Sequence, residues 1–170
     1  MSQDPIAFEA WSDNGSLGVR LRASVMTAIR SFCVSADPNE TGGILIGRYV
    51  ENHRFAEIVQ AVGPTPDSRA GRTWFWRGTK GLQDLLDRLW INEGLYYLGE
   101  WHYHVRSSPA PSLTDDEQMY EISRDPKWSC PEPVLLIMSW NGSSAWSTAV
   151  FIYRRDRPCV GCSIQVASTT

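Results

Sequence analysis

Two histidines and one aspartate carry the strongest chemical pattern in this sequence. His102 and His104 are separated by one residue, so on a β-strand both side chains would project from the same face. Asp115 follows a proline-containing loop, near the start of a predicted helix, and the loop lets the chain turn back toward the histidines. Two imidazole nitrogens and one carboxylate form a known catalytic zinc set. The spacing therefore predicts a zinc site.

Three protein ligands favour catalysis over a structural role. A structural zinc site is closed by four protein ligands, whereas three leave a position open for water. Zinc lowers the pKa of such a water to about 7, and a general base must then accept its proton. Ser112, three residues before Asp115, is placed to donate a hydrogen bond to a developing oxyanion.

This pattern resembles the signature of the JAMM metalloproteases, also called MPN+ or JAB proteins. The chain has His-x-His, ten residues and then Asp, with Ser three positions before the Asp. The family also has an upstream glutamate followed by a Gly-Gly strand, which Asn-Glu-Thr-Gly-Gly-Ile-Leu-Ile-Gly at 39–47 fits. The resemblance implies that zinc is held by His102, His104 and Asp115, with Glu40 as the base for water and Ser112 at the oxyanion.

The resemblance covers nearly the whole chain and implies a fold and a reaction. The expected fold is a single JAB/MPN domain over residues 1–170, of mixed α/β class, with the cytidine-deaminase-like arrangement of a curved central sheet flanked by helices. The implied reaction is zinc-dependent amide hydrolysis, with one zinc per chain. Val105 stands where the family usually has proline, a departure that removes no ligand.

The implied substrate is a protein conjugate. Family members mostly cleave after the C-terminus of ubiquitin or a ubiquitin-like protein. Leu-Gly-Glu-Trp-His-x-His at 98–104 and Pro-Ala-Pro-Ser at 109–112 resemble the bacterial branch, found in operons with E1-like and E2-like conjugation enzymes, including antiphage systems. One kind conjugates a ubiquitin-like protein, and the other, in CBASS operons, conjugates the nucleotide cyclase itself. The segment 67–78 favours the ubiquitin-like kind, for deconjugation or precursor trimming.

Three alternatives remain at this stage. The first is a processing protease for a sulfur-carrier protein. The second is a metal-free MPN scaffold, which has no need of all five residues of the signature. The third is a metalloprotein in which zinc has only a structural role and holds the loop between His104 and Asp115 in place.

Composition sets the broad class. The chain has 170 residues, 42% of them hydrophobic and 21% charged, as expected of a soluble globular domain. A net charge of −3 gives no basic footprint for nucleic acid. No apolar run is long enough to span a bilayer, and the first residues lack the features of a signal peptide, so a cytoplasmic location is expected. Four scattered cysteines, including the lone pair Cys159-x-x-Cys162, are expected to be reduced thiols.

Hydrophobic periodicity predicts the elements that hold the site. Strands are expected at 8–11, 17–21, 43–49, 54–62, 74–77, 96–104, 131–140 and 146–153, and helices from 24 to before 37, from 82 to before 94, and over about 114–124. The segment 63–72 is expected to be a loop and 154–157 a solvated end. Most of the eight tryptophans, including Trp90 on the apolar stripe of the second helix, are expected in the core.

Two further features bear on the site. Gly42 and Gly43 are expected where the backbone passes close to the metal face or to a substrate strand, or in a turn or bulge. Glu100 points with the two histidines by parity. It is either a partner that orients an imidazole or a charge on the sheet face, and we favour the supporting role.

Overall fold

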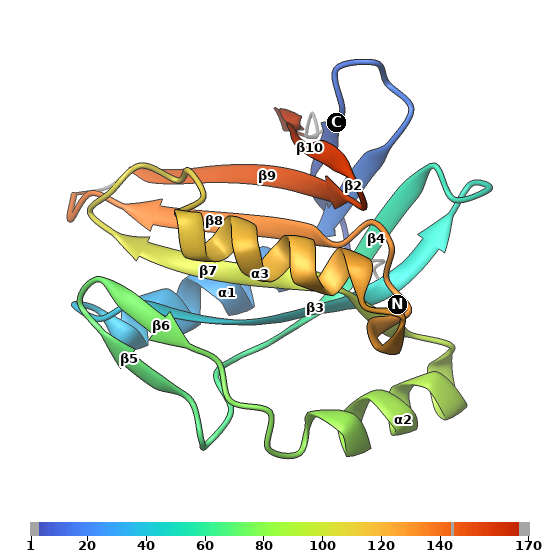
Figure 1. Cartoon of the computed structure of the whole chain (residues 1–170). Coiled ribbons are helices and arrows are strands. Elements are labelled where there is room, and N and C mark those ends of the chain that lie inside the picture. Colours follow the sequence, from blue (N-terminus) through green and yellow to red (C-terminus); the bar gives the residue numbers. More distant parts are fainter. Residues whose placement is uncertain (1–3, 144, 167–170) are drawn as a thin grey trace.

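The structure is a computed structural model that describes residues 4–143 and 145–166 (Figure 1). The strands are β1 (Ile6–Trp11), β2 (Gly18–Arg22), β3 (Thr41–Val50), β4 (Phe55–Val62), β5 (Arg69–Gly71), β6 (Trp74–Trp76), β7 (Tyr96–Val105), β8 (Val134–Trp140), β9 (Trp146–Arg154), β10 (Arg157–Gly161) and β11 (Ser163–Val166). The helices are α1 (Ala23–Ala36), α2 (Leu82–Glu93), α3 (Leu113–Arg124) and the short 3-10 helix η1 (Pro126–Trp128). The predicted mixed α/β class is therefore confirmed. Among the helices in these ranges, none is long and apolar enough to cross a membrane.

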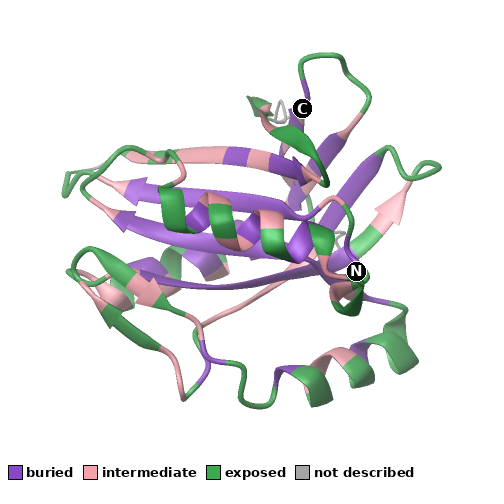
Figure 2. Ribbon diagram, viewed as in Figure 1, coloured by how far each residue is buried: buried purple, intermediate pink, exposed green. Residues whose placement is uncertain are grey.

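Strand β7 lies near the middle of a nine-stranded sheet. The strand order is β10-β9-β8-β7-β3-β4-β2-β1-β11, and β5 and β6 form a separate two-stranded hairpin. β7 pairs with β3 in antiparallel and with β8 in parallel fashion. Figure 2 shows that these three strands are buried along most of their length. A strand held on both sides is a rigid support for side chains that must keep a fixed geometry.

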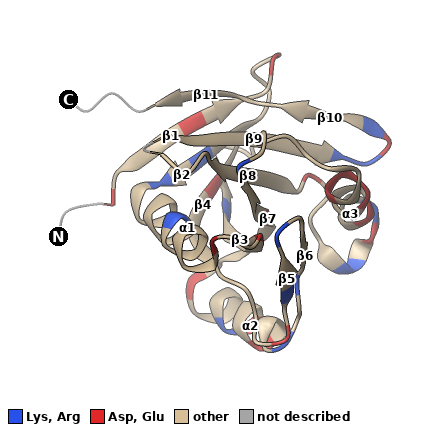
Figure 3. Ribbon diagram, turned by 90° about the vertical axis from the view of Figure 1, so that its left-hand side faces the viewer, with Lys and Arg blue, Asp and Glu red and all other residues tan. Residues whose placement is uncertain are grey.

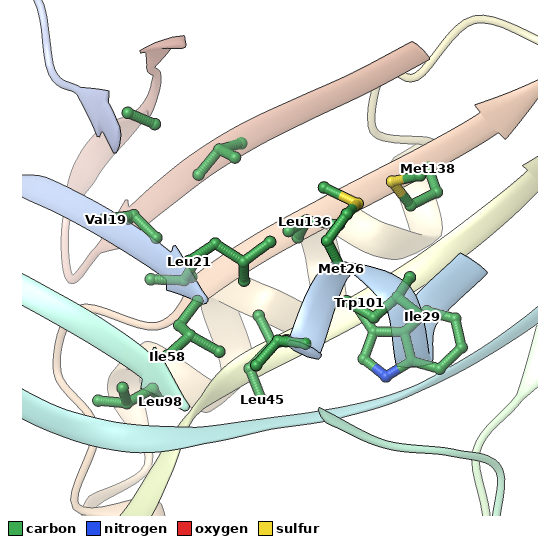
Figure 4. Packing of buried hydrophobic residues seen from close by; sticks show 14 of the residues in the cluster. Val19, Leu21, Met26, Ile29, Leu45, Ile58, Leu98, Trp101, Leu136 and Met138 are labelled. Carbon is green, nitrogen blue, oxygen red and sulfur yellow. The ribbon is translucent and has the colours of Figure 1, made fainter. Parts of the chain in front are cut away.

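Helix α1 covers one face of the sheet. Its buried residues Met26 and Ile29 pack with Leu21, Trp101 and Leu136 in a hydrophobic cluster (Figure 4). Because side chains alternate along a strand, Trp101 on this face places its neighbours on β7 on the other face.

Helices α2 and α3 lie on the opposite face. Met119 and Ile122 of α3 pack on Leu135 and Ile137 of β8, so α3 lies across β7 and β8 (Figure 1). α2 contributes Leu82 and Leu89 to the same cluster. Glu100, His102 and His104 belong to this second face.

Two expectations about the chain are wrong. The segment 154–157 is largely exposed, as expected, but it is not an end, because the chain turns there into β10, and β11 then pairs with β1 at the other edge of the sheet. The expected loop at 63–72 includes β5, which pairs with β6. β5, β10 and β11 have only three to five residues each, so their sequences carry almost no periodicity, and β11 also depends on pairing with β1 at the other end of the chain.

The tryptophans are less buried than expected. Trp101 is fully buried, but Trp74, Trp76 and Trp90 are 52%, 57% and 61% exposed. Trp90 continues the apolar stripe of α2, yet only Leu82 and Leu89 of this helix are buried. The other four, Trp11, Trp128, Trp140 and Trp146, are half-buried, so the expectation that most tryptophans lie in the core is wrong. The four cysteines are free, as expected.

Candidate metal centre

The strand β7 places the two histidines side by side on the face covered by α3. His102 and His104 are 7% and 9% exposed. His102 lies opposite Gly42 on β3 and opposite Ile137 on β8. Both flanking strands therefore hold the histidine backbone, and the alternation that the sequence predicted is the one that the structure shows.

The start of α3 brings the carboxylate to the histidines. Ser112 is the N-cap of α3: its Oγ accepts the Asp115 N–H at 3.2 Å, and its own backbone N–H donates to Asp115 Oδ2 at 2.7 Å. The Ser112 hydroxyl also donates to Asp115 Oδ2, at 2.7 Å. This capping box fixes the Asp115 side chain within the first turn, pointing back toward the strand.

The three side chains form a donor set that fits a metal ion. Asp115 Oδ1 lies 2.6 Å from His102 Nδ1, and Asp115 Oδ2 lies 3.3 Å from His104 Nε2. One ligand atom from each residue falls within 4.8 Å of the other two. All three residues are buried, and two imidazoles with one carboxylate suit zinc. The donors are therefore gathered as a three-ligand centre requires.

The electrostatics of the cluster are those of a cation site. Burial opposes ionisation of Asp115, but the hydrogen-bonded histidines outweigh it and hold the pKa of Asp115 well below its ordinary value. Burial likewise opposes the protonated form of His102, yet the Asp115 and Glu100 carboxylates raise its pKa to about 9. These carboxylates stabilise positive charge at this position, whether it is a proton on the ring or a metal ion in its place.

A cavity of about 370 Å³ opens over these residues. Its lining includes Glu40, both histidines, Ser112 and Asp115, with Thr73, Trp74 and Phe75 from the β5–β6 hairpin. The five residues of the signature, scattered between positions 40 and 115, thus line one cavity. The hairpin forms the wall opposite α3.

Glu40 sits at the rim of this cavity, directly before β3. Its backbone N–H donates to the carbonyl of Gly71 on β5 at 2.8 Å, so the hairpin holds it in place. The side chain is half-buried, and burial raises the pKa of its carboxyl, a shift that the two histidines oppose. A carboxyl with a raised pKa is better suited to accept and return a proton near neutral pH.

Gly42 leaves room for the His102 ring. A Cβ at this position would lie 2.9 Å from His102 Cδ2 and 2.6 Å from the Trp101 carbonyl oxygen. It would also meet the Phe75 ring at 2.9 Å. The expectation of close backbone approach to the face of the histidines is confirmed for Gly42 but not for Gly43, where a Cβ would meet the Val62 carbonyl oxygen and the Trp101 ring.

Comparison with known proteins identifies the family. The Prok-JAB family model, described as prokaryotic homologs of the JAB domain, matches residues 22–150. The chain belongs to this family. It is 41% identical over 150 residues to the CD-NTase/cGAS isopeptidase of Enterobacter hormaechei subsp. hoffmannii (strain UCI 50), covering 87% of this chain and 83% of that protein. The solution structure of protein DSY2949 from Desulfitobacterium hafniense is similar in fold, with a TM-score of 0.59 at 20% identity, covering 86% of this chain and 88% of that one.

The sequence missed part of the polar surroundings of this JAB-domain site. Arg77, just after β6, pairs with Glu100, and Gln118 of α3 donates to the same carboxylate. Gln118 follows Asp115 by three residues and so lies on the same side of α3. No pattern in the sequence indicated a role for Arg77, because only the fold of the hairpin turns its side chain toward β7.

Proposed function

We propose that this JAB-domain protein is a zinc-dependent isopeptidase that releases a CD-NTase from its conjugates. The convergence of two imidazoles, a carboxylate and a nearby glutamate on one cavity supports the hydrolase chemistry. The 41% identity to the Enterobacter protein named CD-NTase/cGAS isopeptidase is the observation that carries the substrate class. That relative favours the CBASS alternative of the sequence analysis over a ubiquitin-like modifier, and it gives no support to a sulfur-carrier protease.

The metal would be held by His102, His104 and Asp115. A zinc ion there would supply a Lewis acid that activates water and polarises the scissile carbonyl. Three protein ligands would leave a further position on the metal for water or substrate, and all three side chains line the cavity.

Glu40 is the proton carrier in this proposal. It takes the proton from the attacking water as the new C–O bond forms, and it returns the proton to the amine as the C–N bond breaks. Its place on the cavity rim gives it access to the reacting atoms, and its raised pKa suits a group that must both accept and donate.

Ser112 has two competing uses for one hydroxyl proton. In the structure this proton goes to Asp115 Oδ2, which supports the metal ligand. To donate to a developing oxyanion, the hydroxyl must turn away from Asp115 toward the cavity that it lines. We propose that it does so during the reaction, while the backbone N–H of Ser112 keeps Asp115 in place.

The surroundings of the cavity suit a protein chain. Acidic residues gather on α3 and basic residues on the β5–β6 hairpin, mostly outside the cavity lining (Figure 3). Trp74 and Phe75 of the hairpin add apolar surface to the lining. E1-like and E2-like enzymes would make the conjugates on which this protein acts.

Cleavage of a purified conjugate tests the proposal. Zinc-loaded protein is incubated with a CD-NTase joined to a target lysine, and in parallel with a ubiquitin-like protein joined in the same way, and the released products are resolved by mass. We expect release of the CD-NTase, loss of release with a chelator, and loss with Glu40→Gln while zinc content is retained. Cleavage of the ubiquitin-like conjugate alone would overturn the substrate class, and cleavage that survives the chelator would overturn the metal mechanism.

A further inference from the structure

Glu100 is fully buried beside the metal centre and has no step in the proposed mechanism. It lies two residues before His102 on β7, on the same face, with 0% of its surface exposed. A buried carboxylate is costly unless it is paired and hydrogen-bonded. The partners that satisfy this carboxylate therefore indicate what it holds in place.

Arg77 provides the main support for Glu100. Its Nη2 lies 2.8 Å from Glu100 Oε1, and its Nε reaches both carboxylate oxygens, at 3.1 and 3.2 Å. The Arg77 side chain is 6% exposed, so the pair is shielded from water. Because Arg77 directly follows β6, this fork ties the end of the hairpin to β7.

Two neutral side chains also donate hydrogen bonds to the Glu100 carboxylate. Gln118 Nε2 donates to Glu100 Oε2 at 3.2 Å, and the Tyr97 hydroxyl donates to Oε1 at 3.3 Å. Gln118 comes from α3, the helix that carries Asp115. One carboxylate therefore connects the hairpin wall, the strand of the histidines and the helix of the third ligand.

The remaining neighbour of Glu100 is the ring of His102. His102 Nε2 lies 3.6 Å from Glu100 Oε2, on the side of the ring away from the Nδ1 contact with Asp115. This nitrogen is buried and has no hydrogen-bond partner within residues 4–143 and 145–166. A small rotation of either side chain brings the two atoms into hydrogen-bond range.

We propose that Glu100, held by Arg77, is a positioning residue that fixes the His102 ring and thereby sets the metal affinity of the centre. Metal-ligating histidines are oriented by outer carboxylates in many proteins, and loss of such a partner typically costs 10- to 100-fold in metal affinity. Stability alone does not account for the Arg77–Glu100 ion pair. Replacing a buried ion pair with apolar residues of similar volume often leaves the stability of a protein unchanged or raises it. The inference rests on the proposed metal site.

Zinc affinity of the full chain, measured by competition with a chelator, tests the proposal without any substrate. Glu100→Gln keeps the shape of the side chain and removes its charge. We expect its zinc affinity to fall about 10- to 100-fold. Glu57→Gln is the matched control, because Glu57 is also buried and paired with arginine but lies opposite Arg48, toward the end of β3 away from Gly42 and His102. Its zinc affinity should stay within about twofold of wild type.

Arg77→Lys separates positioning from simple attraction between charges. Lysine keeps the positive charge but cannot hold the carboxylate with a two-point fork. If Glu100 acts only as a negative charge near the metal, zinc affinity should not change. If Glu100 orients His102 only when Arg77 fixes its carboxylate, zinc affinity should fall about tenfold in this variant. The absorption bands of the cobalt-substituted protein should then shift as well.

The outcomes are distinct. Wild-type affinity in Glu100→Gln would overturn the inference and leave the proposed function standing. The inference would also be overturned if Glu100→Gln lost zinc affinity while Arg77→Lys kept the zinc affinity and the cobalt spectrum of wild type. Failure of the wild-type chain to bind zinc would overturn the proposed function together with the inference. If Glu100→Gln does not fold by circular dichroism, Arg77→Lys alone decides between the two explanations.

Discussion

Two buried glutamates in the central sheet, Glu57 on β4 and Glu100 on β7, both pair with arginine, but their surroundings differ. Glu57 is 5% exposed, while its partners Arg22 and Arg48 have side chains 25% and 52% exposed. Glu100 and its partner Arg77 are both shielded, at 0% and 6%. The first pair lies at the water boundary of the scaffold, and the second is enclosed next to a metal-ligating ring.

The same contrast holds for two glycines. A Cβ on Gly18 would lie 2.5 Å from the ring of Phe55, a contact within the scaffold. A Cβ on Gly42 would meet the His102 ring and the Trp101 backbone. Similar packing constraints therefore serve stability at β2 and the geometry of the metal centre at β3. Variants at these two positions should separate the two consequences.

The largest effect is expected from Asp115→Ala, which removes a proposed metal ligand. Zinc affinity should fall by more than about a hundredfold, since even outer partners of a ligand are worth 10- to 100-fold. Because a bound metal stabilises the folded state by mass action, chelator should lower the melting temperature of wild type but not of this variant. Asp116→Ala, on the next residue of α3, is the control and should retain zinc. Equal zinc content in both variants would remove Asp115 from the ligand set.

Gly42→Ala and Gly18→Ala test the comparison directly. Each adds a methyl group to a filled space, so each should lower the free energy of unfolding by about 1–3 kcal/mol. Only Gly42→Ala should also weaken zinc binding, by about tenfold, because the methyl group displaces the His102 ring. Thermal unfolding and chelator competition on both variants measure the two effects. Zinc binding weakened equally by both would show that the two regions are not independent.

Ser112→Ala should have a smaller effect on stability. Loss of the N-cap hydroxyl is expected to cost about 1 kcal/mol in the free energy of unfolding. Zinc should remain bound, since the backbone N–H of Ser112 still contacts Asp115. Denaturant unfolding together with metal analysis would show this, and complete loss of zinc would mean that the hydroxyl itself holds the ligand.

Glu57→Gln should have the smallest effect. Its arginine partners are partly exposed, so the loss of free energy of unfolding should be about 1 kcal/mol or less. Zinc affinity and conjugate cleavage should match wild type. A loss of zinc in this variant would show that the scaffold pair and the metal centre are coupled through the sheet.

The main elements and the ligand pattern could be predicted because their signals are local. The alternation around His102 and His104 determines a shared face, and Ser112 with Asp115 three residues later marks a helix start. The strands β10 and β11 could not be predicted in this way. These strands have five and four residues, too few to carry a clear period; β10 pairs with its neighbour β9, whereas β11 depends on pairing with β1 at the other end of the chain.

The sequence by itself determined the family, the mixed α/β class and the set of residues suited to a metal hydrolase, because spacing along a strand and at a helix start decides which side chains share a face. Only the tertiary structure decided that Glu40 reaches the same cavity, that Arg77 turns inward to Glu100, and that Trp74, Trp76 and Trp90 remain exposed. These outcomes depend on how the hairpin and α2 pack against the sheet. Packing between segments distant in the chain leaves no period in the sequence.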